Sequence, residues 1–328
     1  AEVEIGPRRS HASLTRELLH GHRVESMSVP HAEQGQFHDA TRVAVRADLV
    51  AALRSFLPAD AVLEQEEEVR PYECDGLSAY RQLPLLVVLP RTEEEVLRIL
   101  ALCHEREIPV VARGAGTGLS GGALPLADGI VLSLARFNRI LDIDPVGRTA
   151  RVQPGVRNLA ISEAAAEYGL YYAPDPSSQI ACSIGGNVGE NAGGVHCLKY
   201  GLTTNNLLGL QVVLMDGEVV DLGGKHLDSE AYDLMGLMTG SEGLLGVITE
   251  VTVRILQKPQ TARGMLMGFP TLDDGANCVA DIIAAGIIPG GLEMMDNMAI
   301  VAADDFQACG YPRDAESLLI CELDGTAS

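Results

Sequence analysis

Apolar residues along the chain occur in short runs that alternate with helix-like spacings, a pattern typical of a mixed α and β protein. Residues 85–89 and 108–112 have the length and composition of buried strands. Between them, Thr92 and Glu95 form a capping box, and the apolar residues that follow repeat on one helical face. The pattern therefore predicts a β-α-β unit that ends close to residue 112.

The rest of the chain divides into elements of similar length. Helical patterns occur at 41–56 and 156–168, and strand patterns at 130–134, 139–143, 149–153 and 246–256. A hairpin across Asp216-Gly217 is predicted for 207–222. After Pro259, strand and helix patterns alternate at 264–269, 272–285, 291–295, 297–303 and 318–323. We therefore expect one region that ends near residue 258 and a second that begins there.

The most informative segment follows the second buried strand. Residues 113–122 contain five glycines and two hydroxyl residues, Thr117 and Ser120. So many glycines indicate unusual backbone angles or a ligand that lies against the main chain. Successive bare N–H groups in a turn form an anion-binding concavity, and nucleotide phosphate is a common large anion. We interpret the segment as a phosphate-binding loop rather than as a flexible surface loop.

The spacing G-x-G-x-x-G that begins at Gly116 also fits a Rossmann turn, in which Asp142 would bind the ribose. That motif requires a helix directly after the glycines. Pro125 and the pair Asp128-Gly129 break any helix at this point, so the Rossmann interpretation fails. We therefore expect the amides of the loop itself to hold the phosphates.

Two further glycine-rich segments lie later in the chain. Residues 174–194 contain two prolines that favour an extended path, together with polar side chains able to donate or accept hydrogen bonds. Residues 240–249 form another loop that enters a strand. Three such loops predict a long ligand that crosses several parts of one domain.

The composition limits the classes of partner. The formal charge of −21 argues against nucleic acid, and the 328 residues contain no run of 18 apolar residues that would predict a membrane span. The seven cysteines include no C-x-x-C pair, which predicts reduced thiols and no metal or iron–sulfur ligand set. Five of the eight histidines lie within residues 1–40, which we expect to form a polar arm.

The three glycine-rich segments resemble a known family. RGAGTGLSGG from Arg113, DPSS from Asp175 with GGN and NAGG, and GSEG from Gly240 with GVIT are similar to the FAD-binding domain of the vanillyl-alcohol-oxidase or p-cresol-methylhydroxylase (PCMH) type. Within it, the sequence is most similar to the group of bacterial glycolate oxidase FAD-linked subunits and D-lactate and D-2-hydroxyglutarate dehydrogenases. The resemblance implies an α+β fold. A two-subdomain PCMH-type FAD-binding domain would cover 41–258, divided near residue 144, and a ferredoxin-like substrate-binding cap would start at 259–328.

The resemblance also implies which residues contact the cofactor. By their numbers in this sequence they are Arg113, Gly114, Ala115, Gly116, Thr117, Gly118, Leu119, Gly122, Pro154, Gly155, Pro174, Asp175, Ser177, Ser178, Cys182, Ser183, Gly185, Gly186, Asn187, Asn191, Gly193, Gly194, Gly240, Glu242, Gly243, Val247 and Ile248. A family variant attaches FAD through a histidine in the first loop. No histidine occurs there in this sequence, so we expect noncovalent FAD.

The implied activity is oxidation of a small 2-hydroxy acid, glycolate or D-lactate, to the 2-oxo acid. A hydride would pass to flavin N5, and the electrons would continue to partner subunits, by resemblance an iron–sulfur subunit and a second flavin-type subunit. A cytoplasmic protein is expected, with peripheral attachment to the inner membrane through partner subunits as a second option. The alternative is an FAD-binding assembly subunit without catalysis.

The catalytic base is unassigned in this sequence. In relatives the cap runs further and carries the catalytic and metal-binding histidines, so we expect the family's base to lie beyond Ser328, in a longer chain. His196 is the candidate base closest to the cofactor motifs, and Arg81 and Lys199 are candidates for binding the substrate carboxylate.

Overall fold

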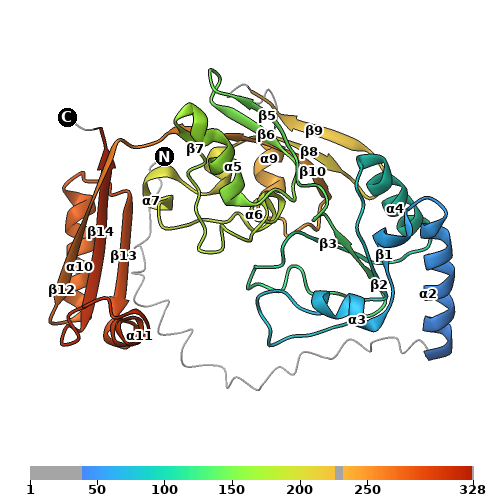
Figure 1. Ribbon diagram of the computed structural model, residues 1–328, viewed down its shortest axis with the longest axis horizontal. Coiled ribbons are helices and arrows are strands. Elements are labelled where there is room, and N and C mark those ends of the chain that lie inside the picture. The colour runs from blue at the N-terminus through green and yellow to red at the C-terminus, as the bar shows by residue number, and fades with distance from the viewer. Residues whose placement is uncertain (1–38, 226–231, 327–328) are drawn as a thin grey trace, which may run out of the picture. The chain divides into compact units, whose positions relative to one another are not determined.

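The computed structural model of the protein describes residues 39–225 and 232–326. The expected polar arm at 1–40 therefore lies almost wholly outside the described residues, and so does Ser328. The chain divides into two compact units, residues 1–47 and 48–328, and helix α2 (Asp39–Arg54) spans the division. The three larger sheets all belong to the second unit (Figure 1).

The first sheet has the strand order β1-β2-β4-β3. It consists of β1 (Val62–Leu63), β2 (Leu86–Val88), β3 (Val110–Arg113) and β4 (Ile130–Ser133). Strands β2, β4 and β3 are parallel, and helix α4 (Glu93–Glu105) connects β2 to β3. The predicted β-α-β unit is confirmed, and the Thr92 hydroxyl accepts a hydrogen bond from the Glu95 amide at 3.2 Å.

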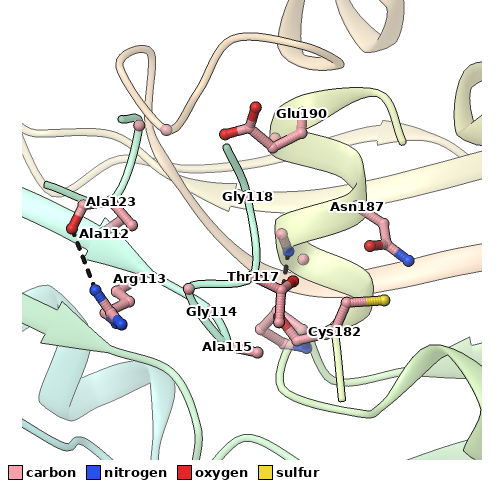
Figure 2. Close-up of a pocket in the computed structure, with 18 of the residues that line it drawn as sticks. Ala112, Arg113, Gly114, Ala115, Thr117, Gly118, Ala123, Cys182, Asn187 and Glu190 are labelled. Atoms are coloured by element: carbon pink, nitrogen blue, oxygen red, sulfur yellow. Dashed lines mark hydrogen bonds between the residues drawn. The ribbon is translucent and has the colours of Figure 1, made fainter. Parts of the chain in front are cut away.

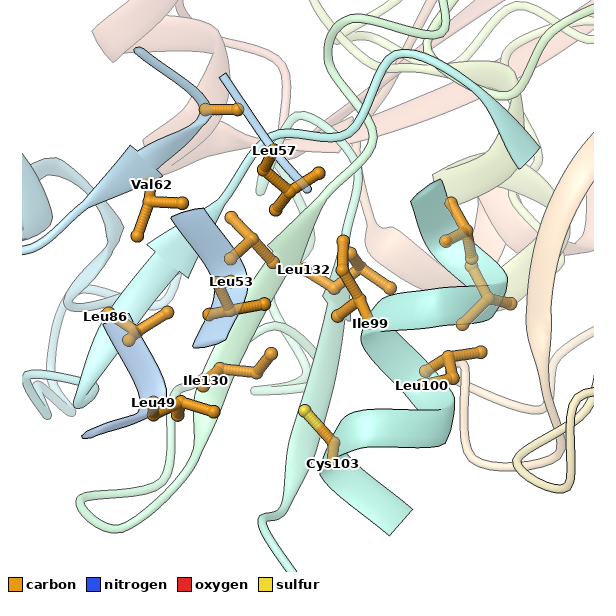
Figure 3. Close-up of a cluster of buried hydrophobic side chains, with 14 of the residues drawn as sticks. Leu49, Leu53, Leu57, Val62, Leu86, Ile99, Leu100, Cys103, Ile130 and Leu132 are labelled. Atoms are coloured by element: carbon orange, nitrogen blue, oxygen red, sulfur yellow. The ribbon is translucent and has the colours of Figure 1, made fainter. Parts of the chain in front are cut away.

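Apolar side chains cover both faces of this sheet. On one face, Leu86 and Ile130 pack with buried residues of α2 and α4 (Figure 3). On the other face, Val87 and Val131 pack with Tyr72. Because strand side chains alternate, both faces of a parallel sheet must be covered. The covering of the second face brings the segment around Tyr72 next to the carboxyl end of β3.

The second sheet is antiparallel, in the order β5-β6-β10-β8-β9. Its strands are β5 (Ile140–Asp144), β6 (Thr149–Val152), β8 (Leu207–Val213), β9 (Val219–Gly223) and β10 (Val247–Arg254). The expected hairpin is confirmed as β8 and β9. Since β5 pairs with β6, the division between the two sheets falls before Ile140 and not at residue 144 as expected.

Helices α5 (Asn158–Ala165) and α6 (Ile184–Glu190) pack against this second sheet. Buried Ile161 of α5 and Val188 of α6 share one apolar cluster with Val251 of β10. This second core is separate from the cluster around α4. The first cluster also includes Val213 of β8 and Val247 of β10, so these two residues of the second sheet pack in the first core. The three glycine-rich segments lie in the connections β3–β4, β7–β8 and β9–β10.

The third sheet has the order β12-β14-β13. Its strands and helices follow the chain as β12 (Thr261–Phe269), α10 (Leu272–Ala284), β13 (Gly291–Asp296), α11 (Asn297–Gln307) and β14 (Ser317–Gly325). Strand β14 lies between β12 and β13 and is antiparallel to both. This is the split β-α-β arrangement of ferredoxin-like folds, so the five elements expected here are confirmed.

Short elements complete the described chain. They are η1 (Ala59–Ala61), α3 (Glu66–Val69), η2 (Arg70–Tyr72), η3 (Ala166–Tyr168), β7 (Leu170–Tyr171), α7 (Cys197–Tyr200), α8 (Thr203–Asn206), α9 (Leu234–Met238) and β11 (Leu256–Gln257). Among the helices of the described residues, none combines the length and apolar character required to cross a membrane.

Candidate cofactor site

All three glycine-rich segments line one pocket (Figure 2). It is formed by residues of 112–118, 122–123, 176–192 and 242–248, together with Asp75, Leu134 and Pro154. Strand β3 of the first sheet leads directly into the pocket, and β10 of the second sheet begins at its wall. Ligands of parallel sheets bind beyond the carboxyl ends of the strands, which is where this pocket lies relative to β3.

Many of the residues expected to contact the cofactor line this pocket. They are Arg113, Gly114, Ala115, Gly116, Thr117, Gly118, Gly122, Pro154, Ser178, Cys182, Ser183, Gly185, Gly186, Asn187, Glu242, Gly243 and Ile248. The structure thus brings together side chains and backbone from segments that are distant in the sequence. Their role toward FAD remains a prediction.

The other expected residues lie outside the lining of the pocket. They are Leu119, Gly155, Pro174, Asp175, Ser177, Asn191, Gly193, Gly194, Gly240 and Val247. Leu119 is 71% exposed, whereas Gly155 is pressed against the Leu134 carbonyl, where an added Cβ would lie 2.4 Å from the oxygen. Asp175 bonds to His196. Gly155 and Asp175 therefore have structural partners of their own.

Sequence reasoning missed several lining residues. They are Asp75, Ala112, Ala123, Leu134, Pro176, Gly189, Glu190, Ala192 and Gly246. Most lie within a few positions of a residue that was predicted, so the glycine segments themselves were the signal. Asp75 is different, because it lies in a loop that precedes the first buried strand and carries no glycine-rich pattern.

The first loop lies directly against the amino-terminal turn of α6. A Cβ at Gly114 would be 2.2 Å from Ser183 Oγ, and a Cβ at Gly185 would be 2.5 Å from Pro154 Cβ. Gly116 has φ +69° and a guanidinium beneath it, since a Cβ there would be 2.2 Å from Arg113 Nη2. The glycines thus permit close backbone approach and, at Gly116, a left-handed conformation.

Residues 182–194 were expected to form a loop, and this expectation is wrong for α6. The Ser183 hydroxyl caps the helix by accepting the Gly186 amide at 3.4 Å. Ile184 and Val188, four residues apart, are both fully buried in the core of the second sheet. Apolar burial and the serine cap therefore outweigh the low helix propensity of the glycines.

Arg113 is the one cation among the described residues that line the pocket. It is 7% exposed, and its Nη1 donates to the carbonyl of Cys74 at 2.8 Å. The same atom donates to the carbonyl of Ala123 at 3.4 Å (Figure 2). Burial lowers the pKa of its guanidinium. The group stays charged because the ordinary pKa of arginine lies far above neutral pH.

Two acidic side chains, Glu190 and Glu242, lie close to the glycine loop. The Ser120 hydroxyl donates to Glu190 Oε2 at 2.9 Å, and Figure 2 shows Glu190 at the end of α6 nearest Gly118. A Cβ at Gly122 would lie 2.7 Å from Glu190 Oε1 and 3.5 Å from Glu242 Oε2. With one buried cation and these carboxylates, an anionic ligand must be held chiefly by backbone amides.

Asn187 presents a further unused group at the pocket. The residue is 4% exposed, and its Nδ2 is buried without a hydrogen-bond partner. Buried polar groups are nearly always paired, because an unpaired one costs about 1–3 kcal/mol. Figure 2 shows the Asn187 amide on the side of α6 away from Gly114 and Gly118, so this donor does not face the glycine loop.

His196 and Lys199 lie outside the pocket and contact β14. His196 Nδ1 is 2.6 Å from Asp175 Oδ2, and its Nε2 is 3.3 Å from Glu322 Oε1. Burial lowers the pKa of His196, but the bonds to the two carboxylates outweigh it and raise the pKa overall. Lys199 pairs with Asp324. His196, the candidate base within this chain, therefore faces β14 and not the pocket.

The expected position of the base, beyond Ser328, falls outside the described residues, which end at residue 326. It therefore stays a prediction. Within the described lining of the pocket, no histidine takes the place of such a base.

The other two sequence candidates for chemistry are also engaged elsewhere. Arg81 pairs with Glu73 at 2.7 Å. Asp142, the ribose-binding acid of the rejected Rossmann interpretation, pairs with Lys225 at 3.4 Å, and no helix occurs in the described residues 114–129. Throughout the described ranges, no group of three or more His, Cys, Asp or Glu side chains is arranged to hold a metal ion.

Comparison with known proteins agrees with this geometry. A family model described as "FAD binding domain" matches residues 84–223, and one described as "FAD linked oxidases, C-terminal domain" matches 258–328. The chain is 64% identical over 283 residues to the glycolate oxidase subunit GlcD of Escherichia coli K12, covering 86% of this chain and 57% of that protein. It is 41% identical over 216 residues to a D-lactate dehydrogenase of Archaeoglobus fulgidus, covering 66% of this chain and 48% of that protein.

A solved structure confirms the expected PCMH-type fold. p-Cresol methylhydroxylase with bound substrate superposes with a TM-score of 0.73 at 20% identity, over 86% of this chain and 61% of that one. Identity at this level shows the fold alone. The chain spans about half the length of the two curated relatives, at 57% and 48%.

Proposed function

This chain belongs to the family of FAD-linked oxidases, and we propose that it binds FAD in the pocket described above and takes part in the oxidation of a small 2-hydroxy acid. The observation that carries the proposal is the convergence of three glycine-rich segments on one pocket. When bound, FAD supplies the hydride acceptor for such an oxidation.

The residues of the pocket fit this cofactor. The loop 113–118 and the start of α6 offer backbone amides for the phosphates, and bulkier residues at Gly114, Gly116 or Gly185 would fill the space between them. Buried Ile248 and Cys182 give an apolar wall. Apolar walls with a few polar groups are typical of cofactor sites.

The substrate class rests on the relatives. One is a glycolate oxidase subunit and another a D-lactate dehydrogenase, and both substrates are 2-hydroxy acids. The word "subunit" in the first name also favours partner subunits that accept the electrons, for which we propose an iron–sulfur subunit and a second flavin-type subunit. The choice between glycolate and D-lactate is a matter for assay.

The test begins with the flavin itself. We expect the purified protein to be yellow and to release its flavin into the supernatant on acid precipitation, because no histidine is among the described lining residues. Protein purified or reconstituted with excess FAD and still free of flavin would contradict the proposal. Flavin that stays in the pellet would contradict noncovalent binding, and Cys182, the one thiol among the described lining residues, would then be replaced by serine.

The lining of the pocket also favours a specific limit on activity. Proton removal needs a base within hydrogen-bonding reach of the substrate hydroxyl. Among the described lining residues there is no histidine, lysine or tyrosine. Of the carboxylates there, Asp75 accepts two backbone amides and Glu190 accepts the Ser120 hydroxyl, which leaves Glu242 as the carboxylate to test as a base. We therefore expect residues 1–328 to bind FAD yet to reduce dyes little with glycolate, and a chain extended past Ser328 through a complete cap to do so rapidly. Rapid turnover by residues 1–328 alone would direct attention to His196.

A further inference from the structure

We propose that Asp75 and Arg113 are positioning residues for FAD, which hold the glycine loop 114–122 in its binding shape through the segment 72–77. The inference rests on the proposed FAD site and concerns how that site is kept in shape. Nothing in the sequence connects residues 72–77 with the loop, since neither a motif nor a period joins them.

Asp75 is the centre of the arrangement. It is 7% exposed and lines the pocket. Its Oδ1 accepts the amide of Leu77 at 2.8 Å, and its Oδ2 accepts the amide of Gly121, 46 residues away, at 2.9 Å. Gly121 has φ +83°, a conformation that the loop must maintain. The Asp75 carboxylate therefore connects residues 72–77 to the last turn of the loop, and each of its oxygens accepts one hydrogen bond.

Gly76 makes a second contact between the two segments, at the middle of the loop. Its amide donates to the carbonyl of Gly118 at 2.9 Å. A Cβ at Gly76 would lie 2.8 Å from the same oxygen and 3.0 Å from the Thr117 carbonyl, so the two backbones are in direct contact. Segment 72–77 thus supports the loop along its length and not only at Gly121.

Arg113 makes the third contact, at the start of the loop. Its Nη1 donates to the carbonyl of Cys74 in the segment and to that of Ala123 just past the loop. Its guanidinium lies 5.5 Å from the centre of the Tyr72 ring, within the range of a cation–π contact. The same group occupies the space beneath Gly116. The buried guanidinium therefore donates to main-chain carbonyls and does not contact the loop amides, which can face a ligand.

These contacts distinguish positioning from simple packing. They connect polar side chains to main-chain atoms at both ends of the loop, and of the loop N–H groups they use that of Gly121. A binding loop held in its bound shape avoids the entropy cost of ordering on binding. Loss of one of these contacts should therefore weaken FAD binding while the apolar cores remain intact.

The test is the replacement Asp75→Asn. The asparagine oxygen can still accept from Leu77, but its NH₂ group would face the Gly121 amide, so that two donors meet. We expect the Kd for FAD, measured by flavin fluorescence on flavin-depleted protein, to rise about tenfold or more. The visible circular dichroism of the bound flavin should change as well, which general destabilisation would not cause.

The matched control is Asp144→Asn. Asp144 also accepts two backbone amides, those of Val146 at 3.1 Å and Gly147 at 2.8 Å, but it lies in a turn that does not line the pocket. We expect the control to keep the Kd of the unmodified protein. Arg113→Lys serves as the second variant if Asp75→Asn fails to fold, since it keeps the charge but shortens the reach to Cys74 and Ala123; its Kd should also rise.

The outcomes separate the inference from the proposed function. If the unmodified protein binds no FAD, the proposed function fails first. If it binds FAD and Asp75→Asn does so with the same Kd and dichroism, only the positioning role is overturned. It is also overturned if the loss of affinity merely accompanies a lower melting temperature of the flavin-free variant than that of Asp144→Asn.

Discussion

Two polar clusters in this protein are built on different principles. At the glycine loop, Asp75 and Arg113 bond to main-chain amides and carbonyls. Where residues 196–200 meet strand β14, by contrast, side chains bond to one another: His196 to Glu322, and Lys199 to Asp324. Both clusters connect segments that are distant in the sequence, and both contain ionised groups.

The difference lies in what each cluster can respond to. Main-chain groups do not titrate, and the two residues that bind them at the glycine loop are both 7% exposed. The contact with β14 depends on the protonation of His196, whose pKa is raised by its carboxylate neighbours. We therefore expect the attachment of the third sheet to vary with pH.

The largest effect is expected at Gly116. Gly116→Val would force a branched residue to φ +69° and place its Cβ within 2.2 Å of the Arg113 guanidinium. Strain and displacement of the guanidinium together should weaken FAD binding more than about a hundredfold, which corresponds to about 3 kcal/mol. Equilibrium dialysis against FAD measures this loss.

Gly121 in the same loop provides the control for backbone strain. It has φ +83°, but an added Cβ would meet no heavy atom within 4 Å. Gly121→Ala should therefore cost only the strain of the left-handed conformation, about 1 kcal/mol, and weaken binding far less than Gly116→Ala. Equal losses of FAD affinity in the two alanine variants would mean that backbone strain alone accounts for the effect, and that the contact of the new Cβ with the Arg113 guanidinium does not contribute.

An intermediate effect is expected at Asp324. Its side chain is 4% exposed, it pairs with Lys199, and it accepts the Tyr200 hydroxyl at 2.5 Å. Burial alone would raise the pKa of Asp324, but Lys199 and Tyr200 lower it overall. Asp324→Asn should reduce the free energy of unfolding by about 1–2 kcal/mol, measured in urea, because the partly exposed lysine is screened by solvent.

The same variant tests whether the two clusters are independent of each other. If they are independent, Asp324→Asn should leave the Kd for FAD unchanged. A large change in that Kd would show that the β14 contact shapes the cofactor pocket, and the distinction between the two clusters would fail.

The smallest effect is a pH dependence at His196. Since its pKa is raised above the ordinary value of 6.5 on folding, the protonated form stabilises the folded state. This stabilisation is complete below the ordinary pKa of 6.5 and is lost as the pH rises through the raised value. The difference in melting temperature between the unmodified protein and His196→Gln should therefore shrink from about pH 6 toward about pH 8.

His104→Gln is the control for this experiment, since His104 is exposed on α4. It should show no comparable trend with pH. A constant difference for His196→Gln across the range would indicate that its hydrogen bonds, and not its charge, hold β14.

Local elements were accessible from the sequence because their causes are local. The N-cap at Thr92, the Asp216-Gly217 turn and the strand and helix patterns after Pro259 all act over a few residues, and the structure confirms them. The second half of the expected capping box does not form, because the Glu95 carboxylate accepts the Arg91 amide and not that of Thr92. The three glycine-rich segments were also visible, because glycine at such density is costly without a close backbone contact or a ligand.

Helix α6 shows where local reasoning ends. Glycine-rich residues 182–194 have low helix propensity, and only their packing on the second sheet makes a helix there. The assignment of β5 to the second sheet likewise depends on its pairing with β6. Propensity is a weak determinant, of at most about 1 kcal/mol per residue, and burial in a core exceeds it.

The kinds of element, the glycine-rich segments and, through them, the expectation of a nucleotide cofactor follow from the sequence alone. The folded chain adds that these segments meet in one pocket, that Asp75 bonds to Gly121 across 46 residues, and that His196 faces β14 instead of that pocket. The physical reason is range. A cap, a turn or a hydrophobic period is set by neighbours along the chain, whereas a hydrogen bond between distant segments exists only after the sheets have packed and brought donor and acceptor within about 3 Å.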